Sequence, residues 1–199
     1  FCMKNEIIIA TKNQNKVYEF KQMLEPMGYQ VKSLLDYQDF PNIEEDGFTF
    51  EDNARIKAET TSKLLGCMVI SDDSGLEIDA FDGQPGVHSA RWLGELTPYS
   101  YKNQVILDRM RDEPNRLARY VCVLALARPN KETIFFRGEC EVEVALEAKG
   151  KHGFGYDPIM LDKNSGKTLA EMSDTEKAAI SHRGIAVRQL KEWFTYEMD

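Results

Sequence analysis

The chain opens with a strand, a helix and a second strand, and this order restricts the fold more than any other feature. Residues Asn5–Ala10 (NEIIIA) predict a buried strand, and Val17, Phe20 and Leu24 then recur at helical spacing. Residues Tyr29–Leu35 predict the second strand. A strand–helix–strand opening favours a sheet with helices packed on its faces, so we expect an α/β fold.

Two adjacent carboxylates, Asp72 and Asp73, interrupt a strand-like apolar run. Residues Cys67–Ser71 predict a strand, and residues Leu76–Asp79 resume it after a kink, so we expect the carboxylates at a strand tip. Like charges that close repel each other, and burial favours neither unless a cation lies beside them. A divalent cation shared by carboxylates from neighbouring strand tips would explain the pair.

Helices and strands continue to alternate along the rest of the chain. Residues Thr49–Asp52 resemble a capping box and predict a helix that ends near Gly66. In the predicted strand Thr133–Leu146, glutamates alternate with apolar residues, which is typical of a strand with one solvated face. The other predicted elements are a helix over Ser100–Arg111, a strand over Leu117–Ala127, a helix that starts with the capping box at Ser173–Glu176, and a helix capped by Ser181.

Length, charge and hydropathy exclude several classes of protein. The 199 residues fit one domain, and a hydrophobic fraction of 42% supports a core. The net charge of −8 argues against a general nucleic-acid surface, which needs a basic patch. Because no segment approaches the roughly 18–20 apolar residues of a membrane span and Phe1–Lys4 lack the apolar stretch of a secretory signal, we expect a cytoplasmic protein without membrane or nucleic-acid partners.

The four cysteines lack the CxxC spacing of a zinc or redox site. Cys67, Cys122 and Cys140 lie in apolar or alternating runs. We therefore expect reduced core thiols there, rather than metal ligands or disulfides.

Cations lie at the starts of two predicted helices. Lys16 falls in the first turn after the loop TKNQNK, while His182 and Arg183 begin the last helix, with Lys177 one turn upstream. An exposed cation at a helix start costs roughly 0.3–1 kcal/mol, and an anion bound there reverses the effect. An ordinary surface lysine explains Lys16 about equally well, and pairing with surface acids explains Lys177 or Arg183 singly. Together, the four predict a ligand with several negative charges.

Two loops offer partners for such a ligand. The acidic run Glu44–Asp46 and the carboxylate Asp73 are candidate ligands of Mg²⁺, which prefers oxygen and commonly retains substrate phosphates. A solvated acidic loop is the alternative for Glu44–Asp46. Residues Gly153–Pro158 (GFGYDP) present an aromatic ring between two glycines, which suits stacking on a base or, alternatively, a packed turn.

Together, six segments closely resemble the inosine triphosphate pyrophosphatase (ITPase) family. These hydrolases remove purine nucleotides that lie outside the standard set. The segments run in the family's order over almost the whole chain, so the resemblance is highly specific. They are ATKNQNK (10–16), EEDGFTFEDNA (44–54), SDDSGLEIDA (71–80), PGVHSAR (85–91), GFGYDP (153–158) and EKAAISHRG (176–184).

The resemblance implies both a fold and an activity. The implied fold is α/β, with an elongated mixed central sheet flanked by helices. Residues 1–199 are expected to form a single ITPase-like domain whose two lobes have a nucleotide cleft between them. The implied activity is Mg²⁺-dependent hydrolysis of ITP, dITP and XTP to the nucleoside monophosphate and pyrophosphate, usually by a homodimer.

The resemblance also implies roles for residues at matching positions. Asp73 is the expected general base, and with Glu45 it is an expected metal ligand. Lys57 is a further phosphate contact, and Ser74 contacts the substrate. The remaining implied binding residues are Thr11, Lys12, Asn13, Gln14, Asn15 and Lys16 for the polyphosphate, Phe154, Gly155, Tyr156 and Asp157 for the base and sugar, and Lys177, His182 and Arg183, which complete the pocket.

Three other functions compete with this prediction. A haloacid-dehalogenase-type phosphatase needs a DxD motif after a strand, which SDDSG (71–75) lacks, and it would release orthophosphate. A nucleotide-sensing module would show no turnover with Mg²⁺. The Maf-like branch of the same fold would act on other modified nucleotides.

Overall fold

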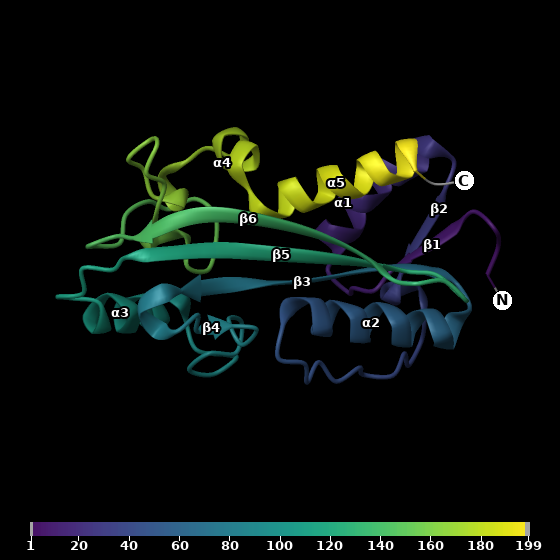
Figure 1. Ribbon diagram of the computed structural model, residues 1–199, viewed down its shortest axis with the longest axis horizontal. Helices are drawn as coiled ribbons and strands as arrows, with labels where there is room; N and C mark the ends of the chain where they lie inside the picture. The colour runs from purple at the N-terminus through teal and green to yellow at the C-terminus, as the bar shows by residue number, and fades with distance from the viewer. Residues whose placement is uncertain (1, 198–199) are drawn as a thin grey trace. The chain divides into compact units, whose positions relative to one another are not determined.

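The computed structural model describes residues 2–197 and confirms a mixed α/β fold (Figure 1). Within these residues, seven strands form one sheet in the order β2-β1-β3-β5-β6-β7, with β4 paired to β3. The strands are β1 (Glu6–Ile9), β2 (Gln30–Ser33), β3 (Met68–Ile78), β4 (Pro85–Gly86), β5 (Leu117–Ala127), β6 (Ile134–Val144) and β7 (Met160–Leu161). The α-helices are α1 (Gln14–Leu24), α2 (Phe50–Leu65), α3 (Tyr99–Arg109), α4 (Asp174–Ile180) and α5 (His182–Tyr196). No described helix is long and apolar enough to cross a membrane.

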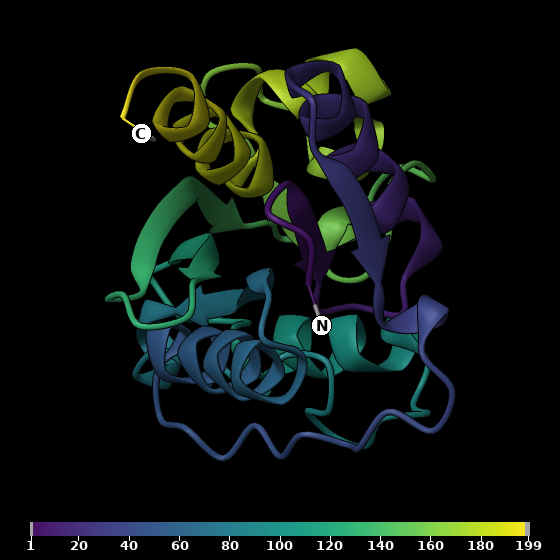
Figure 2. The same cartoon turned by 90° about the vertical axis from the view of Figure 1, so that its right-hand side faces the viewer.

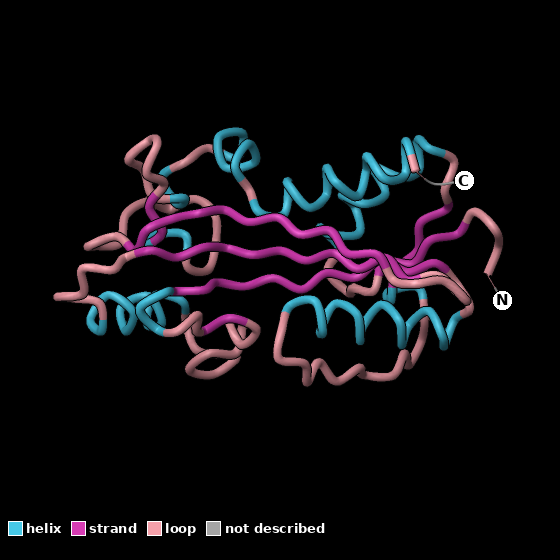
Figure 3. Tube along the Cα trace, viewed as in Figure 1, coloured by secondary structure: helices cyan, strands magenta, loops and turns pink. Residues whose placement is uncertain are grey.

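The chain divides into two compact units. The first combines the residues up to Asp73 with Val123–Arg137 and the residues from Ala186 onward, and the second combines Ser74–Cys122 with Gly138–Ile185. The three long strands β3, β5 and β6, drawn in magenta in Figure 3, contribute residues to both units.

In the first unit, β1 pairs in parallel with β2 on one side and with β3 on the other. Helices α1 and α5 lie on one side of these strands and α2 lies on the other (Figures 1 and 2). A parallel strand covered on both faces needs an unbroken apolar sequence, and Ile7 and Ile8 of β1 are fully buried. This explains why the run NEIIIA is a strong strand signal.

In the second unit, β6 shows the predicted alternation. Cys140 and Val142 are buried, whereas Glu139 and Glu141 are exposed. The buried side chains join a core that includes Tyr120 of β5. The glutamates are therefore part of a solvated face, as predicted.

The prediction that Asp72 and Asp73 end a strand is wrong, because β3 runs unbroken through both. The shorter strand β1 is the one that ends there, since its last residue, Ile9, pairs with Ile70. Beyond that point β3 still has β5 as a neighbour, which allows its extended backbone to continue. The two carboxylates therefore lie just past the end of β1, beside the start of the segment that leads to α1.

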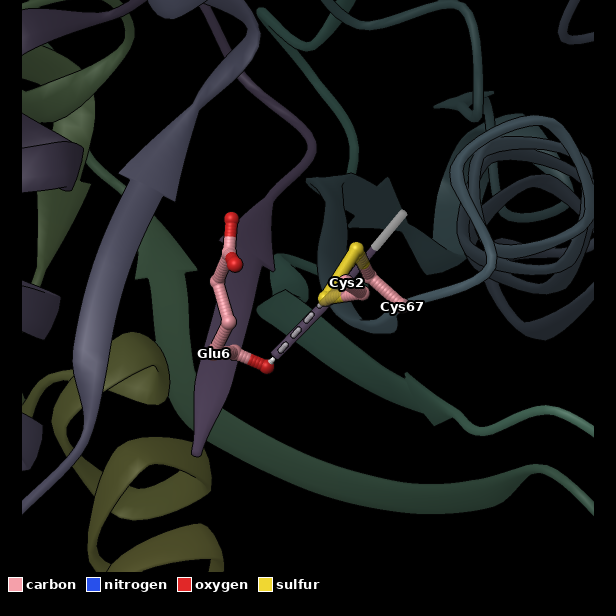
Figure 4. Close-up of side chains that lie close together, drawn as sticks. All are labelled: Cys2, Glu6 and Cys67. Atoms are coloured by element: carbon pink, nitrogen blue, oxygen red, sulfur yellow. Dashed lines mark hydrogen bonds between the residues drawn. A yellow bond between two sulfur atoms is a disulfide. The ribbon is translucent and has the colours of Figure 1, made fainter. Parts of the chain in front are cut away.

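The prediction of reduced thiols is confirmed for Cys122 and Cys140, which are buried and form no disulfide, and is wrong for Cys67. Cys67 forms a disulfide with Cys2, close to Glu6 (Figure 4). The parallel pairing of β1 with β3 explains the contact, because it places the residues before β1 beside those before β3. Sixty-five positions separate the two cysteines in the sequence, so local patterns did not reveal it.

Candidate functional site

The loop between β1 and α1 is organised by its own side chains. The Asn13 side chain caps α1, because its Oδ1 accepts hydrogen bonds from the backbone N–H groups of Asn15 (2.9 Å) and Lys16 (3.2 Å). The Thr11 hydroxyl oxygen in turn accepts from the Asn13 N–H at 3.1 Å. The side chains of Lys12, Gln14 and Asn15 are exposed. Thr11 and Asn13 thus fix the backbone from which Lys16 extends.

Lys16 reaches across to β3. Its Nζ lies 2.7 Å from Asp72 Oδ2, and the Asp72 side chain is buried while that of Lys16 is about one-third exposed. A buried carboxylate needs such a partner. The ion pair with Lys16 explains why Asp72 can be buried in the middle of β3.

Lys57 of α2 links β3 to the acidic loop. Its Nζ donates to the backbone carbonyl of Asp72 at 2.8 Å and lies 3.1 Å from Glu45 Oε1. Thr49 caps α2 by accepting from the Asp52 N–H, as predicted. The cap fixes the first residue of the helix and therefore the position of Lys57 on it. Lys16 and Lys57 therefore place two positive charges beside the β3 carboxylates.

Asp73 has the properties of a general base near neutral pH. The pKa of Asp73 is raised to about 7: burial is the main cause, the Lys57 charge opposes the rise, and the Glu45 and Asp72 charges add to it. A hydrogen bond with Asn53 lowers the pKa of Asp73 in part. Its Oδ2 is buried and has no hydrogen-bond partner among the described residues. A carboxylate with a pKa near 7 and a free oxygen is suited to accept a proton.

Asn53 is a buried residue of this cluster that the sequence did not suggest. Its Oδ1 accepts the Gly47 N–H at 2.8 Å, and its side chain also bonds to Asp73. A Cβ at position 47 would lie 2.6 Å from Asp52 Cβ, so only glycine fits this turn. Asn53 thus ties the acidic loop to the candidate base. The only sequence signal for Asn53 is its position in the first turn of the predicted helix α2, directly after the acidic loop.

The carboxylates suit a Mg²⁺ ion that keeps phosphate and water ligands. The unpartnered Asp73 oxygen and its repulsion by Glu45 both favour a cation there. Among residues 2–197, only Cys2, Glu6 and Cys67 form a group of three or more candidate ligands within 4.8 Å of one another. The disulfide between Cys2 and Cys67 removes the thiolates from that group (Figure 4). The β3 carboxylates therefore offer only some of the ligands that Mg²⁺ needs. In phosphate chemistry Mg²⁺ is commonly bound by one or two carboxylates, and phosphate and water supply the rest.

The second unit contains a cavity of about 180 Å³. Polar and aromatic side chains share its lining with backbone atoms, a mixture typical of small-molecule sites. The lining residues are Ser74, Gly75, Leu76, Ser89, Ala90, Tyr99, Tyr120, Phe154, Gly155, Tyr156, Asp157, Lys177 and His182.

Asp157 is the polar centre of this cavity and is 97% buried, its exposed fraction being 3%. Its Oδ1 accepts from the Tyr120 hydroxyl at 3.0 Å, and its Oδ2 accepts from the Phe154 N–H at 3.1 Å and from Lys177 Nζ at 2.6 Å. Lys177 Nζ also lies 4.8 Å from the centre of the Phe154 ring, which is 81% exposed. The network fixes a carboxylate and an ammonium beside an aromatic face that is open to solvent.

His182 stacks on Tyr120, with ring centres 5.1 Å apart and planes 17° apart. The pKa of His182 is lowered to about 4, mainly by burial and in smaller part by the nearby Lys177 charge, so the imidazole is neutral at pH 7. A neutral imidazole has one donor and one acceptor nitrogen, which suits recognition of a polar ring edge.

Sequence reasoning missed several residues that shape the cavity. Tyr120 lies in the apolar strand β5 and resembles a core residue, although its hydroxyl is a signal because a buried hydroxyl needs a partner. The Tyr156 hydroxyl donates to the Ser89 carbonyl at 2.5 Å, and the Tyr156 ring packs edge-on against Tyr99 at 5.1 Å. Tyr156 was expected at the site, but Ser89 and Tyr99 were not.

The predicted site residues therefore fall into two groups, one in each unit. The first unit holds the loop Thr11–Lys16 together with Glu45, Lys57 and Asp73. The second holds Ser74, Phe154, Gly155, Tyr156, Asp157, Lys177, His182 and Arg183. Ser74 is exposed, and Arg183 is partly buried.

The sequence is similar to a known protein family and to several named proteins. The model of the Ham1 family matches residues 7–193. The dITP/XTP pyrophosphatase of Exiguobacterium sibiricum is 48% identical over 192 residues, which are 96% of this chain and 97% of the relative. The dITP/XTP pyrophosphatase of Bacillus licheniformis is 50% identical over 187 residues, or 93% and 95% of the two chains.

A solved structure gives the same result for the fold. The structure of the Staphylococcus aureus Ham1 protein matches with a TM-score of 0.92 at 38% identity, covering 97% of this chain and 100% of that one. The family model covers more than half of this chain, and the identities extend over nearly its whole length. The chain is therefore a member of the Ham1 family.

Proposed function

We propose that this protein hydrolyses dITP, ITP and XTP to the nucleoside monophosphate and pyrophosphate, with Mg²⁺ as cofactor. The observation that carries the chemistry is a buried carboxylate, Asp73, whose pKa lies near 7 and whose Oδ2 has no partner among the described residues. The relatives named dITP/XTP pyrophosphatase support the choice of substrates. Removal of these nucleotides from the pool is the resulting role.

The triphosphate binds to the first unit. Lys16 and Lys57 supply positive charge, and the capped loop Thr11–Lys16 supplies polar groups at the start of α1. In the structure both lysines pair with carboxylates, so phosphate binding exchanges these partners. The short Lys16–Asp72 pair keeps the Lys16 ammonium in place until the substrate arrives.

Glu45 and Asp73 are the residues that would hold Mg²⁺. When bound, the ion neutralises the triphosphate and makes pyrophosphate a better leaving group. Lys57 lies within ion-pair distance of Glu45, so it also screens the repulsion between the two carboxylates.

Asp73 accepts a proton from a water molecule, whose oxygen forms a bond to the α-phosphorus. The bond from the α-phosphorus to the bridging oxygen breaks, and the electron pair leaves with pyrophosphate. Lys16 and Lys57 stabilise the charge on the leaving oxygens. Most of the rate enhancement in such phosphoryl chemistry comes from positioning and electrostatics.

The purine binds in the cavity of the second unit. The exposed Phe154 ring offers a stacking face, and Lys177 can donate to the O6 atom of a 6-oxo purine. The Asp157 carboxylate and the neutral His182 ring are polar groups for the N1–H edge. An adenine base would leave such groups unpaired, which disfavours it. Ser74, Gly155, Tyr156 and Arg183 complete the binding groups.

We propose that residues 1–199 form a single ITPase-like domain with two lobes, because the consecutive residues Asp73 and Ser74 belong to different units. The protein acts in the cytoplasm as a homodimer, as the family resemblance implies. Size-exclusion chromatography with light scattering tests the dimer.

A nucleotide panel tests the activity directly. The chain is incubated with dITP, ITP, XTP, dATP and dGTP, with and without Mg²⁺, and pyrophosphate and orthophosphate are measured separately. We expect pyrophosphate from the first three nucleotides only when Mg²⁺ is present. Release of orthophosphate instead would favour a phosphatase, and absence of turnover on all five would refute the proposal.

A further inference from the structure

Helix α3 carries a lysine in the protein interior that the proposed chemistry does not use. The Lys102 residue is fully buried, with an exposed fraction of 0%. Within the part of the chain that the structure describes, no carboxylate lies within ion-pair distance of its Nζ. Burial accordingly lowers the pKa of Lys102. A buried ammonium without an acid is costly, so its contacts need an explanation.

The contacts of Lys102 lead to the purine cavity. Its Nζ donates to the backbone carbonyl of Ala90 at 3.1 Å and lies 4.7 Å from the centre of the Tyr99 ring. Both Ala90 and Tyr99 line the cavity, whereas Lys102 lies behind them. The ammonium is thus held by a carbonyl dipole and an aromatic face, both of which attract a cation.

The next residue, Asn103, makes an equivalent contact with a different part of the wall. Its Nδ2 donates to the backbone carbonyl of Gly155 at 3.1 Å, and Asn103 is 95% buried, its exposed fraction being 5%. Gly155 has φ of 65°, and a Cβ there would lie 3.7 Å from the Tyr99 ring. Gly155 therefore sits closely against the start of α3, with its carbonyl held by an amide.

The spacing of these side chains on α3 is informative. Tyr99, Lys102 and Asn103 are three and four residues apart, so they share one helix face with the buried residues Ile106 and Met110. Ile106 and Met110 are ordinary core residues, whereas the first turn of the same buried face carries an ammonium and an amide. A helix that only filled the core would be apolar along its whole buried face.

We propose that Lys102 and Asn103 are positioning residues that hold two walls of the purine cavity, at Ala90 and Gly155, at a fixed spacing. The inference rests on the proposed function, because it assigns the cavity to the base. Neither residue lines the cavity, so both act through the backbone carbonyls that they bind. Loss of either hydrogen bond allows one cavity wall to move and weakens binding of the base. The phosphate-binding residues of the first unit keep their own contacts.

Steady-state kinetics of the full chain test this role with the variants Lys102→Met and Asn103→Leu. Each removes a donor and keeps a side chain of similar size. We expect each to raise KM for dITP about tenfold and to change kcat by less than about twofold. Inhibition by inorganic tripolyphosphate, which has no base, should stay unchanged. Ile106→Val is the matched control, because it weakens the same buried face without touching a cavity wall and should lower Tm but leave KM unchanged.

The outcomes separate this role from the proposed function. A wild-type chain that hydrolyses neither dITP nor XTP would refute the proposed function itself. With an active wild type, an unchanged KM in both variants would refute the positioning role, and so would an equal loss of affinity for nucleotide and tripolyphosphate, since that indicates general unfolding. If Lys102→Met does not fold, Asn103→Leu decides the question alone by the same measurements.

Discussion

Lys57 Nζ donates a hydrogen bond to the backbone carbonyl of Asp72 at 2.8 Å, and so a residue of α2 is tied to the middle of β3. The same ammonium lies 3.1 Å from Glu45. One lysine therefore joins the helix, the strand and the acidic loop, and its charge opposes the rise in the pKa of Asp73.

Replacing Lys57 by methionine should shift the pH dependence of activity. The Lys57 charge lowers the pKa of Asp73, so its loss raises that pKa and the base becomes active only at higher pH. We expect the rising limb of kcat/KM against pH to move to higher pH, and kcat/KM at pH 7 to fall roughly 10²-fold because the proposed phosphate contact of Lys57 is also lost. The exposed Lys63 on the same helix supplies the control, Lys63→Met. An unshifted profile in Lys57→Met would contradict the coupling.

Replacing Asp73 by asparagine should abolish most turnover and retain binding. The amide is the same size but cannot accept the proton, so we expect kcat to fall by about 10²–10⁴-fold. Calorimetric titration with a non-hydrolysable dITP analogue checks that binding persists. The control is Asp52→Asn on α2, which makes the same substitution at a carboxylate that is not the proposed base. Near-normal kcat in Asp73→Asn would exclude Asp73 as the base.

Metal-free stability should depend on pH through Asp73. Its pKa is raised to about 7 in the folded protein, so between about pH 4 and pH 7 the folded state binds more protons than the unfolded state. The contribution of Asp73 to stability is therefore present below pH 4 and is lost as the pH rises to 7. We expect the Tm of Asp73→Asn relative to wild type to be higher at pH 8 than at pH 5, and added Mg²⁺ to narrow the difference. Equal differences at both pH values would argue against a raised pKa.

His182 should make the opposite contribution. Its pKa is lowered to about 4, so between about pH 6.5 and pH 4 the unfolded state binds more protons than the folded state. The stability that the neutral His182 contributes is present above pH 6.5 and is lost as the pH falls. Chemical denaturation of His182→Gln at pH 7.5 and pH 5 should show a smaller loss on acidification than wild type. The control is His152→Gln, which removes an exposed histidine outside the cavity.

Replacing Tyr120 by phenylalanine should weaken base binding. The change removes the hydroxyl that donates to Asp157 but keeps the ring that stacks on His182. Because a hydrogen bond to a charged group contributes about 1.5–3 kcal/mol, we expect KM for XTP to rise roughly tenfold or more, with a smaller change in kcat. Tyr18→Phe, an exposed site on α1, is the control. An unchanged KM would mean that Lys177 and the Phe154 N–H orient Asp157 without Tyr120.

Much of the fold could be predicted from sequence, because its signals are local. The apolar run of β1, the Thr49 cap of α2 and the alternation in β6 each depend on residues a few positions apart. The same holds for the capping box at Ser173, which starts α4 as predicted. Helix and strand formation responds to such periodicity and capping, so these predictions are confirmed.

Other features required the fold, because their partners are far apart in the chain. Lys16 pairs with Asp72 across 56 positions, and Asn103 holds Gly155 across 52. The unbroken course of β3 depends on β5, and the Cys2–Cys67 disulfide depends on parallel pairing. Local pattern thus determined which segments become helices and strands and which motifs carry acids, lysines and glycines. Only the tertiary structure decided which of those side chains meet, because burial and pairing energies arise between elements brought together by the sheet.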